Sequence, residues 1–333
     1  MLRRARVPPA SAARPASPTP ARRAENYARP DPQQRCASEE AGMYVSGGRL
    51  RTGRRDGHLV EDLPALRKVV PHLMATRLEG TIYYTQHLDV EHLMDWLDEV
   101  NAGLVADDPR RVKFFHVFLT AYARLFRVRP ELNRFISGRR TYEHREISFS
   151  FTVKQAMTES APDLQARIVF TGTETVEEAR ARVEEVVTSA RAGTQSEDDP
   201  LTDVLVRLPV PVVAGIARVA WTLDAANLLP RFLQDAVPVY ASSYLVNLGS
   251  LGGNAPFHHL YQRGTASIFT SIGTIEPEPV VDASGQVVAR RRVDVVYTVD
   301  ERATDGFYLV RSAELLQSML ADPESLTRPV RDG

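Results

Sequence analysis

The sequence predicts an α+β fold in which a mixed sheet is packed by helices, because helical and strand periodicities alternate along it. Residues 109–128 indicate an amphipathic helix, since apolar side chains such as Phe115, Leu119 and Tyr122 recur on one stripe. Residues 146–153 (EISFSFTV) alternate apolar and polar side chains, which is typical of a half-buried strand. The predicted strands are too many and too scattered for a Rossmann unit.

The remaining elements follow from the same two periods. Helices are expected at 60–75, 90–105, 175–190 and 309–320, the first of them interrupted by prolines. Further strands are expected at 81–90, 167–171, 237–248, 266–275 and 287–299. No internal repeat is found in the sequence.

The composition limits the classes of function. The chain has 333 residues, 43% of them hydrophobic, which is enough to bury a large core. Its 41 basic and 42 acidic residues leave a net charge of −1, so the overall charge gives no reason to expect nucleic acid as a partner. The single cysteine, Cys36, excludes an internal disulfide. No run reaches about 18 apolar residues, so we expect no transmembrane segment and predict a cytoplasmic protein.

The first residues differ in composition from the rest. Residues 1–42 hold seven prolines and eight arginines and almost no large apolar side chain. Such a segment cannot bury enough surface to offset its ordering entropy, so we predict a disordered tail over 1–55 and one domain over 56–333. An Arg-rich, acid-poor start is also typical of an organellar transit peptide. The alternative is a genome that favours arginine, with translation starting at Met1 or at Met43.

Residues 201–235 are mostly apolar and carry few charges. Arg207, Pro209, Pro211 and Arg218 interrupt the segment, so it is not expected to span a bilayer. We expect core helices here. The alternative is a face that docks a partner or lies on a membrane surface.

The common catalytic motifs are absent from the sequence. It contains no G-x-S-x-G, H-E-x-x-H, Walker loop or paired C-x-x-C motif, and the glycine-rich stretch 249–253 (GSLGG) is expected to be a turn. His258 and His259 are adjacent, and neighbouring side chains of a strand point to opposite faces. No metal site is therefore expected at this pair, although either histidine is a candidate for contact with a substrate.

The sharpest local pattern is the segment 300–306 (DERATDG), which follows an alternating strand and precedes a helix. Arg302 is able to pair with Asp300 or Asp305, and Gly306 permits a tight turn. A salt-bridged turn and a functional loop both explain this pattern.

This motif resembles the catalytic domain of the acyltransferase subunits of 2-oxoacid dehydrogenase complexes, a family that shares its fold with chloramphenicol acetyltransferase. The resemblance covers roughly residues 60–327 and is most specific in the C-terminal third. The family's Asn-Leu-Gly strand end is matched at 246–249, its Pro-Val-Val at 279–281 and its Asp-His-Arg-x-x-Asp-Gly at 300–306. Further family-like features lie at 129–133, 147–153, 266–273 and 322–323.

The resemblance implies a homotrimeric acyltransferase with active sites between subunits. The residues that it implies as catalytic are Glu301, Asp305 and Asn247. The residues that it implies as substrate-binding are His258, His259, Ser242 and Arg302.

Two positions depart from the family pattern. Glu301 stands where the family has a histidine that takes the proton from the thiol of coenzyme A or dihydrolipoamide, and the mismatch between a carboxylate and a thiol is about 6 kcal/mol. Val246 stands where the family has a hydroxyl residue that stabilises the oxyanion, and losing one such donor costs about 3–4 kcal/mol.

The lysines exclude one further family feature. The chain has only Lys68, Lys113 and Lys154, and none lies in the acidic hairpin that a lipoylated lysine requires. We therefore expect no covalently bound cofactor, and we predict transfer of an acyl group between a thioester of coenzyme A and an acceptor that the sequence does not identify. The alternative is a catalytically inactive relative that binds a partner or an acyl ligand through residues 201–235.

Overall fold

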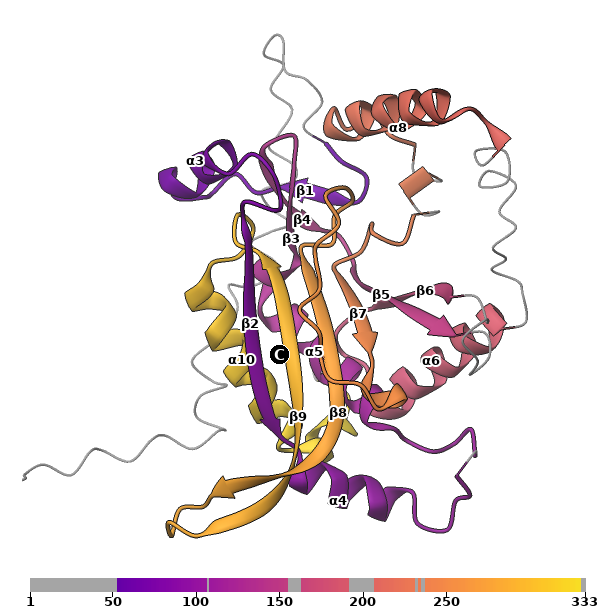
Figure 1. The fold of residues 1–333 in the computed structure, drawn as a ribbon, viewed down its shortest axis with the longest axis vertical. Coiled ribbons are helices and arrows are strands. Elements are labelled where there is room, and N and C mark those ends of the chain that lie inside the picture. Colours follow the sequence, from indigo (N-terminus) through magenta and orange to yellow (C-terminus); the bar gives the residue numbers. More distant parts are fainter. Residues whose placement is uncertain are drawn as a thin grey trace, which may run out of the picture. The chain divides into compact units, whose positions relative to one another are not determined.

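A six-stranded mixed sheet is the largest sheet in the structure (Figure 1). The structure is a computed structural model that describes residues 53–106, 108–154, 163–191, 207–230, 233–234 and 237–330. The strands of this sheet are β2 (Thr81–Asp89), β5 (Ile147–Lys154), β6 (Asp163–Phe170), β7 (Ser243–Asn247), β8 (Ile268–Val281) and β9 (Val287–Asp300). They lie in the order β2-β9-β8-β7-β5-β6, with β7 parallel to β5 and β8 and the other pairs antiparallel. The predicted α+β fold with a mixed sheet is confirmed.

The helices agree with the predicted ones in place but not always in length. They are α3 (Ala65–Leu73), α4 (Glu91–Val100), α5 (Phe114–Val128), α6 (Val176–Arg191), α8 (Val210–Ala225), α10 (Gly306–Leu320) and α11 (Pro323–Leu326), with 3-10 turns η1 (Pro130–Asn133) and η2 (Gly249–Leu251). The predicted helix at 109–128 begins only at Phe114. The Asn101 side chain accepts a hydrogen bond from the Val112 N–H at 2.9 Å and donates one to the Val112 carbonyl at 2.8 Å. These bonds hold the backbone extended before the helix starts.

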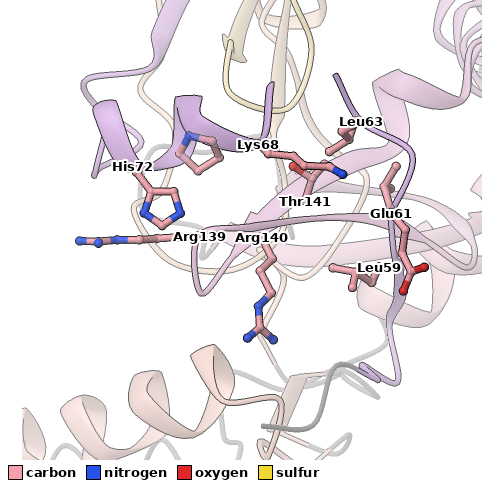
Figure 2. A pocket seen from close by; sticks show the side chains of 10 residues that line it. Leu59, Glu61, Leu63, Lys68, His72, Arg139, Arg140 and Thr141 are labelled. Atoms are coloured by element: carbon pink, nitrogen blue, oxygen red, sulfur yellow. The ribbon is translucent and has the colours of Figure 1, made fainter. Parts of the chain in front are cut away.

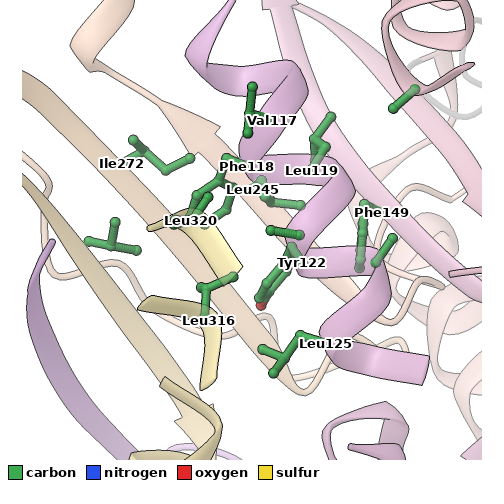
Figure 3. Packing of buried hydrophobic residues seen from close by; sticks show 14 of the residues in the cluster. Val117, Phe118, Leu119, Tyr122, Leu125, Phe149, Leu245, Ile272, Leu316 and Leu320 are labelled. Carbon is green, nitrogen blue, oxygen red and sulfur yellow. The ribbon is translucent and has the colours of Figure 1, made fainter. Parts of the chain in front are cut away.

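Helix α5 packs on one face of the large sheet and forms the main core (Figure 3). Strand alternation sends Phe149 and Leu245 to this face, where they pack with the apolar stripe of α5. The buried Tyr122 hydroxyl is also satisfied, since it lies 2.9 Å from Thr270 Oγ1 and 3.2 Å from Ser243 Oγ. Full burial of one large apolar side chain contributes about 1.5–3 kcal/mol, so this layer holds the strands in register.

A second, three-stranded sheet was not predicted. It consists of β1 (Gly57–Leu59), β3 (Arg134–Ser137) and β4 (Arg140–His144) in the order β1-β4-β3. These strands have three to five residues and several charged side chains, so they are too short to show a strand period.

Arg54 joins this small sheet to α8. Its buried guanidinium donates to Ser137 Oγ at 2.6 Å and forms ion pairs with Asp56 at 2.7 Å and Asp224 at 2.9 Å. Arg54 therefore belongs to the packed structure, although it precedes residue 56. The boundary of the predicted tail remains a prediction, because residues 1–52, with Met1, Cys36 and Met43, lie outside the described residues.

Helix α8 does not meet the expectation of core helices at 201–235. None of its sixteen residues is buried, and Val210, Ile216 and Val219 are 81%, 46% and 60% exposed. Its C-terminal half contacts a small cluster around Leu229 and Val239, while residues 201–206 lie outside the described residues. In the described parts of the chain, no helix combines the length and the apolar character needed to cross a membrane.

Candidate active site

The segment 300–306 is built around a buried ion cluster. Asp300 ends β9, is fully buried, and accepts hydrogen bonds at 2.8 Å from both Nε and Nη2 of Arg302. The Arg77 guanidinium lies 3.5 Å from the same carboxylate. Arg302 thus pairs with Asp300 and fixes the loop, because breaking a buried pair leaves an uncompensated charge.

Arg77 ties this cluster to a second loop. Its guanidinium donates to the carbonyls of Tyr261 at 2.8 Å, Gly264 at 2.8 Å and Ala266 at 3.1 Å. Burial lowers the pKa of Arg77 below its usual value, and the Asp300 carboxylate opposes that shift. No sequence pattern had indicated Arg77, because its partners are backbone carbonyls far away in the chain.

Glu301 is held by its backbone and not by its side chain. Its N–H donates to the Gly80 carbonyl at 2.7 Å, and its own carbonyl accepts from Arg67 Nη1 at 3.1 Å. Arg67 also donates to the Ala303 carbonyl at 3.2 Å. The Glu301 carboxylate is partly exposed and makes no hydrogen bond or ion pair to any residue that the structure describes. The loop therefore presents a carboxylate that is free to meet a ligand or another chain.

Asp305 caps helix α10. Its carboxylate accepts a hydrogen bond from the Tyr308 N–H at 2.8 Å, and Gly306 is the first residue of the helix. An N-cap of this kind contributes about 1 kcal/mol. The turn lies at residues 301–304, just before Gly306, and the Ala303 N–H donates to the Asp300 carbonyl at 2.9 Å within it.

Asn247 lies at the end of β7, away from Glu301 in the same chain. It pairs with Ile272 on β8, which pairs with Val295 on β9. Asp300 lies five residues further along β9, about 17 Å at the rise of a strand. The structure therefore does not bring Asn247 and Glu301 together within one chain, and Val246 beside Asn247 offers no side-chain donor.

The turn after β7 requires glycine. A Cβ atom on Gly249 would clash with the Gly273 carbonyl, and Gly252 has a φ of 75°. Ser250 Oγ donates to the Asn247 carbonyl at 2.8 Å. The predicted turn at 249–253 is confirmed, and it fixes the backbone of Asn247.

Ser242 is engaged in the sheet. It is 1% exposed, its Oγ accepts from the Ser148 N–H at 2.9 Å, and it lies 3.2 Å from the Glu146 carbonyl. These bonds join the start of β7 to β5 and leave the hydroxyl little capacity for a substrate.

His258 and His259 lie in an irregular segment rather than in a strand. Their rings stack with centroids 4.5 Å apart, so the expectation of opposite faces is wrong. The His258 ring also stacks on Phe269 at 3.8 Å, and Thr298 Oγ1 donates to the His258 carbonyl at 2.6 Å. Burial lowers the pKa of His258, which favours the neutral ring. His259 is the exposed member of the pair.

The histidine pair covers the face of the sheet opposite α5. Phe269 on that face stacks on Tyr244, whose hydroxyl lies 2.9 Å from Thr152 Oγ1.

Among the described residues, no group of three His, Cys, Asp or Glu side chains is arranged to hold a metal ion.

The comparisons with known proteins concern the C-terminal third and the fold. Residues 241–328 match the family model described as 2-oxoacid dehydrogenases acyltransferase (catalytic domain). Solved structures match more of the chain, at low identity. A probable dihydrolipoamide acetyltransferase from Listeria monocytogenes is 14% identical, with a TM-score of 0.53, over 81% of this chain and 95% of that chain. The fold is that of an acyltransferase catalytic domain.

Two further structures with this acyltransferase fold agree. The cubic core of a pyruvate dehydrogenase multienzyme complex is 15% identical with a TM-score of 0.53, and a dihydrolipoamide acetyltransferase from Azotobacter vinelandii is 14% identical with a TM-score of 0.54. Each covers 81% of this chain and 95% of that chain. No curated protein matches the sequence. The resemblance predicted from the segments around 246–249 and 300–306 is confirmed at the level of family model and fold.

Proposed function

We propose that this chain moves an acyl group between a thioester, that of coenzyme A, and an acceptor, in sites formed between the subunits of a homotrimer. The observation that carries the proposal is the free carboxylate of Glu301 on a loop whose backbone is held by Gly80 and Arg67. A carboxylate that has no partner in its own chain and sits on a fixed backbone is positioned to contact a substrate.

The sheet register supports a site between subunits. Asn247 lies about 17 Å along the strands from the end of β9, so it would meet Glu301 only as Asn247 of the partner subunit. The surroundings of the Glu301 loop favour such an interface. Leu73, Leu78 and Phe307 are 71%, 78% and 77% exposed near this loop, and exposed apolar side chains of this size are typical of association surfaces.

In this proposal the acceptor is a thiol, and Glu301 would take the proton from it as it attacks the thioester. The proton moves from the sulfur to the carboxylate, the thiolate attacks the acyl carbonyl, and the leaving thiolate takes the proton back. Asn247 would line the acyl site, and the stacked His258 and His259 would contact the substrate. In the Azotobacter enzyme a serine, a histidine and an asparagine have roles in the catalytic mechanism. In our proposal a carboxylate replaces that histidine.

A thiol-release assay with purified protein and a panel of acyl thioesters tests this function. We expect turnover with at least one thioester, and we expect Glu301→Gln to lower kcat about 100-fold or more. Glu99→Gln is the matched control, since Glu99 is exposed on α4 and distant from the loop in sequence. Turnover that is unchanged in Glu301→Gln would contradict the role of Glu301.

Mixed trimers test where the site lies. Glu301→Gln and Asn247→Ala should each be inactive alone, but random mixing of the two should restore about a quarter of the sites, because each site takes one residue from each of two neighbours. No recovery on mixing, or a stable monomer by mass in solution, would contradict a site between subunits.

A second function is favoured by α8. In this alternative the chain is a catalytically inactive relative that binds a partner or an acyl ligand through the apolar surface of α8. None of the sixteen residues of this helix is buried. Absence of turnover with every thioester, together with saturable acyl-thioester binding, would support this candidate over catalysis.

A further inference from the structure

A pocket of about 530 Å³ lies between α3 and the small sheet, apart from the residues of the proposed acyl site (Figure 2). Its walls come from the segment after β1, from α3 and from the β3–β4 turn. The lining residues are Leu59, Val60, Glu61, Leu63, Lys68, Pro71, His72, Arg139, Arg140 and Thr141. Its volume falls within the range of small-molecule sites.

The pocket is strongly cationic. Lys68, Arg139 and Arg140 carry three positive charges, and Glu61 is the one acid in the lining. Within the described structure, none of these three cationic side chains has an ion pair or a hydrogen bond. Arg54, by contrast, is buried and pairs with Asp56 and Asp224.

The floor of the pocket is apolar and firm. Leu59, Val60 and Leu63 line one side, and Pro71 is the buried residue of α3. Thr141 is 6% exposed and also lines the pocket. An apolar floor with a few polar groups at one rim is typical of a site for a small organic anion.

The turn between β3 and β4 carries Arg139, and Arg140 follows it as the first residue of β4. Gly138 and Arg139 have φ values of 54° and 63°, and the strands on either side pair Ser137 with Arg140. Positive φ at both central residues is typical of the two-residue turns that join the strands of a hairpin. Arg54 holds Ser137 from below at 2.6 Å, so the turn is fixed before any ligand arrives.

We propose that this pocket binds a phosphorylated small molecule, with the phosphate held by cationic side chains of the lining and the apolar part against the apolar lining residues. A phosphate monoester carries about −1.5 to −2 charges at pH 7, which matches three cations opposed by one acid. Guanidinium groups also bind phosphate oxygens in pairs. The inference does not depend on acyl transfer, because Arg67, and not a pocket residue, is the part of α3 that contacts the Glu301 loop.

Calorimetric titration of the full chain with pyrophosphate, ADP, adenosine and citrate tests the proposal. We expect pyrophosphate and ADP to bind, with affinity falling as salt rises. If ADP binds more tightly than pyrophosphate, the ligand of the pocket is an organic phosphate. If the two bind equally, the ligand is free phosphate. Citrate that binds more tightly than pyrophosphate would overturn the proposal in favour of a carboxylate site.

Paired variants assign the binding to the pocket. Lys68→Gln with Arg140→Gln should weaken pyrophosphate and ADP about tenfold or more, since two charged contacts are lost. Both side chains are exposed, so the fold should survive, which thermal unfolding checks. Arg290→Gln, an exposed arginine on the distant β8–β9 hairpin, is the matched control. Unchanged affinity in the double variant, or no binding to the unaltered chain, would overturn the proposal.

Discussion

Helices α5 and α8 are both apolar, but only one of them is covered. Eleven of the fifteen residues of α5 are buried, whereas none of the sixteen residues of α8 is. In α5 the polar side chains that enter the core are satisfied, as at Tyr122. In α8 apolar side chains such as Val212 and Ile216 remain open. An apolar composition therefore indicates that burying the helix would be favourable. It does not show that residues of the same chain bury it.

The largest expected effect belongs to the ion cluster of the sheet that α5 covers. Asp300→Asn should lower the free energy of unfolding by about 3–5 kcal/mol, because it leaves Arg77 and Arg302 as buried charges without their carboxylate. Chemical denaturation measures the loss. Asp294→Asn on the same strand is the control, since its carboxylate is exposed and should change stability by less than about 1 kcal/mol. Equal losses in the two variants would show that the cluster does not hold the loop.

The two helices are compared directly by truncating one apolar side chain in each. Leu119→Ala in α5 should cost about 3 kcal/mol, because Leu119 is fully buried and a cavity would remain. Val219→Ala in α8 should cost less than about 0.5 kcal/mol, because the side chain is already 60% exposed. Urea denaturation of both variants checks the difference, and similar costs would break the comparison.

Acid should destabilise the α5 layer. Burial lowers the pKa of His116 to about 4, and its Nδ1 accepts a hydrogen bond from the Lys113 N–H at 3.2 Å. The unfolded chain, with a histidine pKa of about 6.5, therefore binds the proton first. Stability is full above about pH 7 and falls between about pH 6.5 and pH 4, by about 3 kcal/mol for this histidine.

The His116→Gln variant isolates this effect. Burial also lowers the pKa of His144 to about 4 and lowers the pKa of His258, so the variant should lose only the part of the pH dependence that His116 contributes. A pH dependence that is the same in His116→Gln and in the unaltered chain would contradict the assignment.

The sequence predicted the large sheet well, because its strands are long and half-buried. The C-terminal motifs were informative because they lie at the ends of regular elements. Asp300 is the last residue of a strand, and Asp305 is the N-cap of a helix. The small sheet was missed because its strands are held by Arg54 and by pairing, not by their own periodicity. The histidine pair was misplaced because its conformation depends on Phe269, which lies in a different element. Local periodicity therefore identifies the parts of the site, and long-range contacts decide how they meet.

A small effect on stability is also expected when α8 is made polar. Ile216→Ser combined with Val219→Ser should change the free energy of unfolding by less than about 1 kcal/mol, since both side chains already face solvent in the isolated chain. Sedimentation of the variant measures whether α8 takes part in association. If α8 is a docking surface, the variant should associate less than the unaltered chain, while Thr222→Ser on the same helix should not differ. A loss of several kcal/mol in the monomer would instead mean that α8 is core, and the contrast with α5 would disappear.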